Sequence, residues 1–248
     1  LRNFKYKSAL TPIKDKSMKN ILARGGIEFL AVFLGIGLSF YVEQWQSDNE
    51  QKDLLVKDCQ NILTDVDEDI LTIENIIDFN NVILKACNNI QSTIISDEVI
   101  IVDSIILDIK KLTYPTFFGI TRSYKLSYST GRLNLYANEK LVKEISKLYD
   151  HFYERLDINS NIYDQVGLKF LDQYVDKNIG YAINGYDYDI KEIVEFLSNK
   201  LFINELLTFS GRVGAYLQRL NETKEQLIVV RELLIEYLAE QNKSEVLN

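Results

Sequence analysis

Residues 202–237 read FINELLTFSGRVGAYLQRLNETKEQLIVVRELLIEY, and this stretch carries the strongest pattern in the chain. Its apolar positions recur at alternating steps of four and three, with Thr223 as the only polar member. They are Phe202, Leu206, Phe209, Val213, Tyr216, Leu220, Thr223, Leu227, Val230, Leu234 and Tyr237. Such heptads are typical of a coiled-coil helix that packs along its length against another helix. The pattern predicts an all-α fold with a long C-terminal helix over about 201–240.

A second apolar row with helical spacing precedes it and supplies the natural packing partner. It comprises Leu55, Cys59, Ile62, Val66, Ile70, Ile73, Ile77, Leu84, Cys87, Ile90 and Ile94. No Gly or Pro occurs between Gly37 and Pro115, so nothing local ends the helix in this region. We therefore expect a stalk helix over 47–95, with the polar Asn80 as a candidate position for a bend. The 201–240 helix is expected to pack back on it in antiparallel fashion.

The sequence between these two helices, from residue 96 to about residue 200, predicts shorter elements. Ser96 is a candidate cap for a short helix with Asp97 and Glu98 in its first turn, ended by Tyr114-Pro115. A brief helix over 121–130 is closed by Gly131, and Asn138 caps a long helix that runs toward Tyr174. Gly180 to Asp189 is the clearest loop.

Composition agrees with a helical, folded protein. Hydrophobic residues make up 46% of the 248 residues and charged residues 26%, which excludes disorder, while 11 Gly and 2 Pro argue against many short strands. One His and two Cys exclude a His-rich metal centre, a cysteine zinc cluster and a disulfide framework. We expect no cofactor and no metal.

Charge is distributed unevenly along the chain. Residues 1–24 hold seven basic side chains and one acidic one, whereas the remainder holds 21 basic and 35 acidic groups. An acidic body repels phosphate, so nucleic acid is not an expected partner.

The segment Ile27–Trp45 lies between these two regions and has the properties of a membrane span. Residues 29–42 are fourteen residues without a charge, and Glu28 to Trp45 would extend about 26 Å as a helix, close to the ~30 Å hydrocarbon core of a bilayer. The alternatives are a buried core helix or a signal peptide with Gly37-Leu38-Ser39 as its cleavage pattern. The basic flank before the span predicts a cytoplasmic N-terminus, with everything after Trp45 on the outer side of the membrane.

Two features of the span are candidates for function. Ala31, Gly35 and Ser39 recur every four residues and form a small-residue stripe of the kind that lets membrane helices pack closely. Arg24, Glu28 and Trp45 are predicted at the membrane interfaces, with Glu28 paired to Arg24 four residues earlier; alternatively, Glu28 lines a polar path in an oligomer.

The spacing of Glu28, Gly35, Ser39 and Trp45 resembles the membrane segment of a family of uncharacterised single-span inner-membrane proteins of Bacteroidetes. A second block, GRLNLYANEKL at 131–141, is similar to that family's Ser-Gly-x-Leu-x-Leu-Ile-x-Asn-x-x-Leu, with Thr130 in place of Ser and Tyr136 in place of Ile. The resemblance implies an anchor in a bacterial inner membrane, a helical periplasmic body and no established chemistry.

Polar residues outside the span give no catalytic motif. His151 has no nucleophile motif beside it, and Asp65, Asp67, Glu68 and Asp69 lack the spacing of a calcium loop, so we interpret these acids as a solvated face. Asp187 and Asp189 are a carboxylate pair that specifies no reaction, and Gly211-Arg212-Val213-Gly214 falls inside the heptads, where it predicts close helix packing. Cys59 and Cys87 are predicted to be buried thiols too far apart on one helix for a disulfide.

The predicted organisation is a basic cytoplasmic tail (1–20), a transmembrane helix (21–46), the stalk helix (47–95) and an extracytoplasmic helical domain (96–248). The favoured function is a non-enzymatic, membrane-anchored interaction or scaffold protein. Its expected partners are the lipid bilayer and either further copies of itself or another inner-membrane or periplasmic protein. The alternatives are an oligomeric channel or proton-path subunit with Glu28 in the membrane, and an extracytoplasmic ligand sensor.

Overall fold

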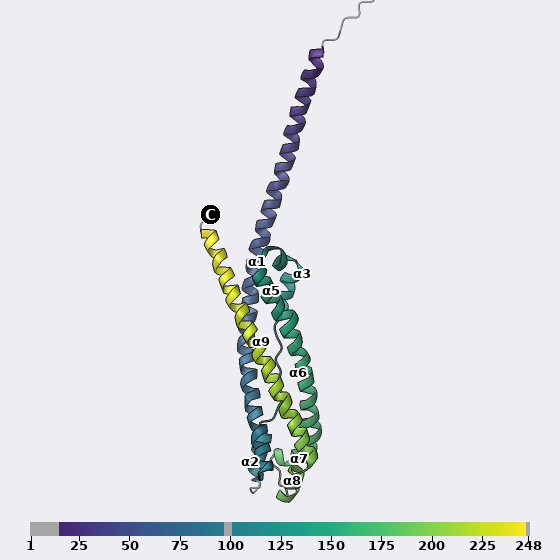
Figure 1. Ribbon diagram of the computed structural model, residues 1–248, viewed down its shortest axis with the longest axis vertical. Coiled ribbons are helices and arrows are strands. Elements are labelled where there is room, and N and C mark those ends of the chain that lie inside the picture. Colours follow the sequence, from purple (N-terminus) through teal and green to yellow (C-terminus); the bar gives the residue numbers. More distant parts are fainter. Residues whose placement is uncertain (1–14, 97–100, 247–248) are drawn as a thin grey trace, which may run out of the picture. The chain divides into compact units, whose positions relative to one another are not determined.

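The computed structural model describes residues 15–96 and 101–246, with side chains described at 25–96, 101–241 and 243. Throughout this part of the chain every regular element is a helix, which confirms the predicted all-α fold (Figure 1). The elements are α1 (Asp15–Ile95), α2 (Val102–Ile109), α3 (Arg122–Ser129), α4 (Arg132–Tyr136), α5 (Glu139–Lys147), η1 (Leu148–Tyr153), α6 (Glu154–Gly167), η2 (Leu168–Val175), α7 (Asp176–Ile183), α8 (Ile190–Leu197) and α9 (Lys200–Val246). Residues 1–14 of the predicted basic tail, and the side chain of Arg24, lie outside the described residues.

The chain divides into two compact units, Leu1–Lys52 and Asp53–Asn248, and α1 contributes residues to both. In the first unit, the large apolar side chains between Ile27 and Trp45 are all about half exposed or more. Within the described residues, α1 is the one helix that is long and apolar enough to cross a membrane, and none of its most apolar stretch is buried. Between Ile27 and Trp45, α1 therefore presents an apolar surface that no other described residue covers.

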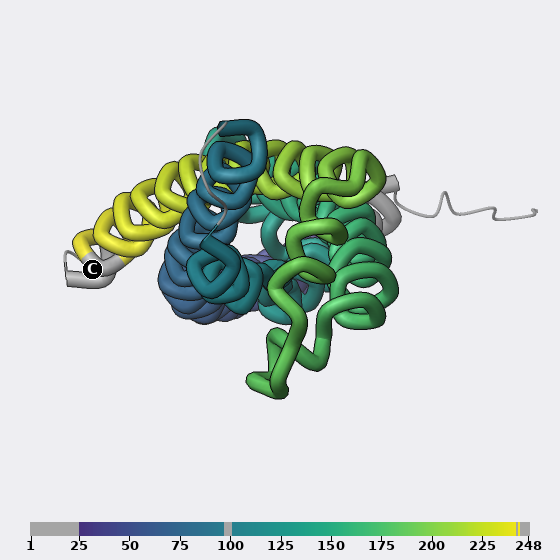
Figure 2. The backbone as a smooth tube through the Cα atoms, turned by 90° about the horizontal axis from the view of Figure 1, so that it is seen from below, coloured from purple at the N-terminus to yellow at the C-terminus, as the bar shows by residue number. Residues whose placement is uncertain are grey.

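The second unit is a bundle of long helices. Elements α5 to α7 follow one another without a break and form one rod, and α9 packs most closely on the α5, η1 and α6 part of that rod (Figures 1 and 2). Two ion pairs join α9 to α1, Arg231 with Asp67 at 2.6 Å and Lys224 with Glu74 at 2.8 Å. Because the later residue of α1 pairs with the earlier residue of α9, these two helices run antiparallel.

The heptad positions of α9 form the centre of this bundle. All eleven are buried, including Thr223, whose hydroxyl donates to the carbonyl oxygen of Arg219 at 2.9 Å. The closest contacts of α9 are with α5, η1 and α6, and its ion pairs reach α1, so α9 packs on more than the stalk helix that the pattern alone predicted.

Two π-helical segments, η1 and η2, interrupt the α5–α7 rod. Buried residues around them follow steps of four: Ile145, Tyr149 and Tyr153 at η1, and Gly167, Leu171, Val175 and Ile179 at η2. Four residues exceed one 3.6-residue turn of an α-helix, so a run of such steps would drift around the helix surface. The wider π turn, bonded i to i+5, keeps these side chains directed at the core.

The segment Leu112–Thr121, here called the strap, forms no helix and is held by side chains of the bundle. The amide of Asn80 donates to the carbonyl oxygen of Pro115 at 3.2 Å, the N–H of Phe117 donates to the Tyr216 hydroxyl at 2.8 Å, and the N–H of Ile120 donates to Asp69 at 2.9 Å. Asn80 therefore fastens the strap to α1, a helix that continues through this position to Ile95.

Several local predictions differ from the structure. The first short helix, α2, begins after Ile101 without a side-chain cap, and it ends at Ile109, before Tyr114-Pro115. Asp97 and Glu98 lie outside the described residues. The predicted loop at 180–189 is shorter, because α7 continues through Gly180 to Ile183. The predicted cap at Asn138 is confirmed, since its side chain accepts the N–H of Leu141 at 2.8 Å.

Candidate functional site

The predicted small-residue stripe lies on the exposed surface of α1. Ala31, Gly35 and Ser39 are all exposed, and the Ser39 hydroxyl donates within the helix to the Gly35 carbonyl oxygen at 2.9 Å. A Cβ atom added to Gly35 would meet nothing within 4 Å in this chain. Glu28 and Trp45 are exposed as well. Close packing through the stripe therefore needs a second chain and stays a prediction.

The acidic residues 65–69 form a solvated face only in part: Glu68 is exposed and the Asp67 side chain is 48% exposed, whereas Asp65 and Asp69 bind backbone N–H groups. Asp69 is buried, accepts the N–H of Ile120 and accepts the hydroxyl hydrogen of Tyr153. Asp65 accepts the N–H of Ser123 at 3.3 Å, and Asp67 pairs with Arg231. This cluster holds the strap and α9 in place.

The remaining sequence candidates have structural roles or none. His151 is exposed in η1, and Asp189 accepts the N–H of Lys191 at 2.8 Å as the cap of α8. Cys59 and Cys87 are buried free thiols, and burial raises the pKa of each to about 12. A thiol with so high a pKa is a poor nucleophile at neutral pH.

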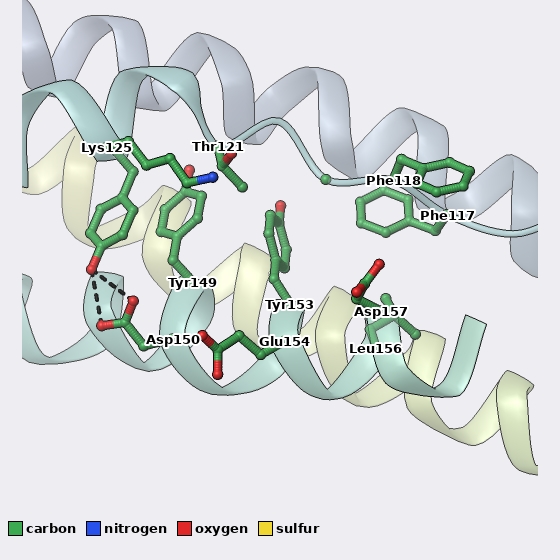
Figure 3. Close-up of a pocket in the computed structure, with 12 residues that line it drawn as sticks. Phe117, Phe118, Thr121, Lys125, Tyr149, Asp150, Tyr153, Glu154, Leu156 and Asp157 are labelled. Atoms are coloured by element: carbon green, nitrogen blue, oxygen red, sulfur yellow. Dashed lines mark hydrogen bonds between the residues drawn. The ribbon is translucent and has the colours of Figure 1, made fainter. Parts of the chain in front are cut away.

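The structure does contain a pocket that no sequence motif indicated. It has a volume of about 360 Å³ and lies between the strap and α3 on one side and η1 and α6 on the other (Figure 3). Its volume falls within the range of small-molecule sites. The lining residues are Phe117, Phe118, Gly119, Thr121, Tyr124, Lys125, Tyr149, Asp150, Tyr153, Glu154, Leu156 and Asp157.

Four aromatic rings form a continuous wall of this pocket. Tyr124 stacks on Tyr149 with ring centroids 4.2 Å apart and planes 3° from parallel, Tyr149 meets Tyr153 edge to face at 5.1 Å, and Tyr153 meets Phe117 in the same way at 5.8 Å. Gly119 permits this arrangement, because a Cβ there would overlap the ring of Tyr153.

Burial keeps the phenols of the wall neutral. Burial raises the pKa of Tyr124 to about 12 and raises the pKa values of Tyr149 and Tyr153 further, with the nearby carboxylate of Asp69 adding to both. Burial also raises the pKa of Asp69 to about 6, against the lowering effect of the hydrogen bonds from Tyr153 and Ile120. The wall therefore offers neutral aromatic faces at physiological pH.

The rim of the pocket is acidic. Asp150, Glu154 and Asp157 contribute three carboxyl groups, and Lys125 is the only basic side chain among the lining residues. Asp150 accepts the Tyr124 hydroxyl at 3.0 Å, and in the described part of the chain none of the three carboxylates forms an ion pair. Over the same residues no cluster of side chains suited to a metal ion is present.

One lining residue has an unsatisfied polar atom. Tyr149 is 4% exposed, and its hydroxyl has no hydrogen-bond partner among the described residues. Figure 3 shows this residue at the end of the pocket formed by Thr121 and Lys125. The hydroxyl oxygen is itself buried, close enough to Asp69 and Asp65 for their charges to raise its pKa, so it is an unpaired polar atom inside the wall.

Sequence reasoning missed this site because its parts lie far apart in the chain. A signal was present: Tyr149 and Tyr153 are one helical turn apart, and Phe117-Phe118-Gly119 places a glycine beside two aromatic residues outside a helix. Neither pattern predicts that residues 117–119 lie against residues 149–153. The π-helical segment η1 adds a structural signal, since such segments are frequent at functional sites.

Fold and site together define an all-α protein with one uncovered apolar helix and a ligand-sized pocket in its helical bundle. The chain belongs to a family of unknown function, DUF6090, whose model matches residues 28–173, more than half of the chain. The matched range begins in the apolar part of α1, ends in η2 and includes every residue that lines the pocket. No curated protein and no solved structure matches the chain.

Proposed function

We propose that this protein is a membrane-anchored, non-enzymatic interaction protein whose helical bundle lies on the outer side of a bacterial inner membrane. The observation that carries the proposal is the uncovered apolar surface of α1 between Ile27 and Trp45. Exposed apolar area of this extent is costly in water, whereas a bilayer removes that cost. The resemblance to single-span inner-membrane proteins of Bacteroidetes supports the same location.

Membrane extraction tests the anchor. The full chain should stay in the membrane pellet after alkaline carbonate treatment. A variant carrying Leu34→Asp and Leu38→Asp should be released, because each charge at the centre of a span costs about 3 kcal/mol. The matched control carries Leu135→Asp and Leu201→Asp, at two exposed leucines of the bundle, and should stay in the pellet. Release of the unmodified chain would contradict the proposal.

Association within the membrane distinguishes a scaffold from a channel. Gly35→Leu should disrupt assembly, because close approach of the helices depends on the missing side chain. Glu28→Gln should leave assembly intact, and neither the parent nor this variant should conduct ions in reconstituted bilayers. A proton or cation conductance that disappears with Glu28→Gln would favour the channel and overturn the scaffold.

A second candidate function, sensing of a small ligand outside the membrane, is favoured by one observation, the pocket between the strap and η1. All its lining residues belong to the unit that starts at Asp53. A ligand that binds there would contact both the strap and the α5–α7 rod, so it would stabilise the bundle in proportion to its affinity.

A further inference from the structure

We propose that the pocket between the strap and η1 binds a small organic amine with an apolar or aromatic body, held by the aromatic wall and the acidic rim. This inference gives the second candidate function a ligand class. It does not depend on the membrane anchor, because every lining residue lies in the second unit.

The aromatic wall favours a cation with an apolar body. Tyr149, Tyr153 and Phe117 line the pocket with the 3–8% of each residue that is exposed, and the raised pKa values of the two tyrosines keep their rings uncharged. Faces of neutral aromatic rings attract cations, and their apolar area removes a ligand's hydrocarbon part from water.

The acidic rim favours an ammonium group over an anion. Asp150, Glu154 and Asp157 outnumber Lys125 among the charged lining residues. Figure 3 shows the carboxylate of Asp157 directed toward Phe117, at the end of the pocket away from Lys125. A primary ammonium group has three hydrogen-bond donors, which suits carboxylate oxygens.

The positive charge of Lys125 makes it possible to test whether the bound molecule is a cation or an anion. Its side chain extends over the Tyr149 end of the pocket (Figure 3). A bound amine is repelled by this ammonium group, so removing the charge should strengthen amine binding. A bound carboxylate would be attracted by it, and the same substitution would weaken that binding.

Calorimetric titration of the full chain in detergent, with phenethylamine, 2-phenylethanol and phenylacetate as probes, tests the proposal. These molecules share a similar body and differ in charge. Phenethylamine should bind at least tenfold more tightly than either of the others. Absence of phenethylamine binding at millimolar concentration, or equal binding of the alcohol or the acid, would overturn the proposal.

Variants then assign the binding to this pocket. Glu154→Gln combined with Asp157→Asn should weaken phenethylamine binding at least tenfold, whereas Glu225→Gln, at an exposed position of α9 outside the pocket, should leave it unchanged. Lys125→Gln should strengthen it severalfold. Unchanged binding in the double variant, or weaker binding with Lys125→Gln, would overturn the assignment. These results are independent of membrane extraction, so failure of the ligand and failure of the anchor are distinguishable.

Discussion

The side chain of Asn80 on α1 accepts a hydrogen bond from the Tyr163 hydroxyl on α6 at 2.9 Å, across 83 residues of sequence. Both residues are buried, and the Asn80 amide also donates to the carbonyl oxygens of Ile76 and Pro115. One polar side chain thus connects α1, the α5–α7 rod and the strap. The Tyr163 hydroxyl is buried and Ile76 and Pro115 are half-buried, so loss of the Asn80 side chain would leave poorly solvated polar groups with fewer hydrogen-bond partners.

Asn80→Leu should therefore destabilise the protein, although leucine fits the apolar row of α1 better than asparagine. The substitution leaves the Pro115 carbonyl without its donor and the Tyr163 hydroxyl with only its longer bond to Thr113, at 3.3 Å. We expect a loss of about 2–3 kcal/mol in the free energy of unfolding. Thermal unfolding followed by circular dichroism measures it. Asn81→Leu, at the exposed neighbouring position, is the control and should be nearly neutral; equal stability of both variants would refute this role for Asn80.

Gly167 shows where helix propensity and packing give opposite predictions. A Cβ at this position would overlap the ring of Tyr114 on the strap, whereas a Cβ on Gly211 in α9 would meet nothing within 4 Å. Gly167→Ala should destabilise the bundle by about 1–3 kcal/mol, while Gly211→Ala should stabilise it by about 0.5–1 kcal/mol. Denaturant titration of the two variants measures both effects. A stabilising Gly167→Ala would show that the strap does not lie against α6.

Asp69 predicts a pH dependence of stability. Its pKa is about 6 in the folded protein, above the ordinary value, so the folded state binds more protons than the unfolded state between pH 4 and 6. Stability from this group is therefore present at low pH and is lost as the pH rises through 6. Relative to the parent, Asp69→Asn should gain about 1–2 kcal/mol in unfolding free energy between pH 4 and 7, because an amide oxygen still accepts from Ile120 and Tyr153.

The control for this pH effect is Glu68→Gln, which removes the same charge from an exposed neighbour. The Asp69 carboxyl is affected by groups from three elements. These are Asp65 and Glu68 on α1, Tyr149 and Tyr153 on η1, and the Ile120 N–H on the strap. Glu68→Gln should show little change in unfolding free energy relative to the parent over the same pH range. A similar gain in both variants would attribute the effect to net charge and not to Asp69.

Sequence patterns predicted those parts of the fold that depend on nearby residues. The heptads of α9, the cap at Asn138 and the continuity of α1 all follow from spacing within one element. The burial of Asp69 could not be predicted from spacing within α1. Its neighbours indicate an acidic helix surface, and the groups that bury it, Ile120 and Tyr153, are 51 and 84 residues away.

The pocket was beyond sequence reasoning for the same physical reason. Its wall forms only when the strap is laid against η1, and the contacts that hold the strap come from Asn80, Asp69 and Tyr216 on two distant helices. The π-helical turns were missed because their signal, apolar residues at steps of four, also fits an ordinary helix over a short stretch.

The sidedness of the bundle tests the central proposal, an anchored protein with its bundle outside the inner membrane. Cys59 and Cys87 are buried, so the parent chain should react little with a maleimide. A cysteine introduced by Ala215→Cys, on the exposed surface of α9, reports on the bundle, and Ser8→Cys reports on the basic segment before the span. With a membrane-impermeant maleimide, we expect intact spheroplasts to label Ala215→Cys at once and Ser8→Cys only after permeabilisation. Labelling of Ser8→Cys in intact spheroplasts with protection of Ala215→Cys would contradict the account.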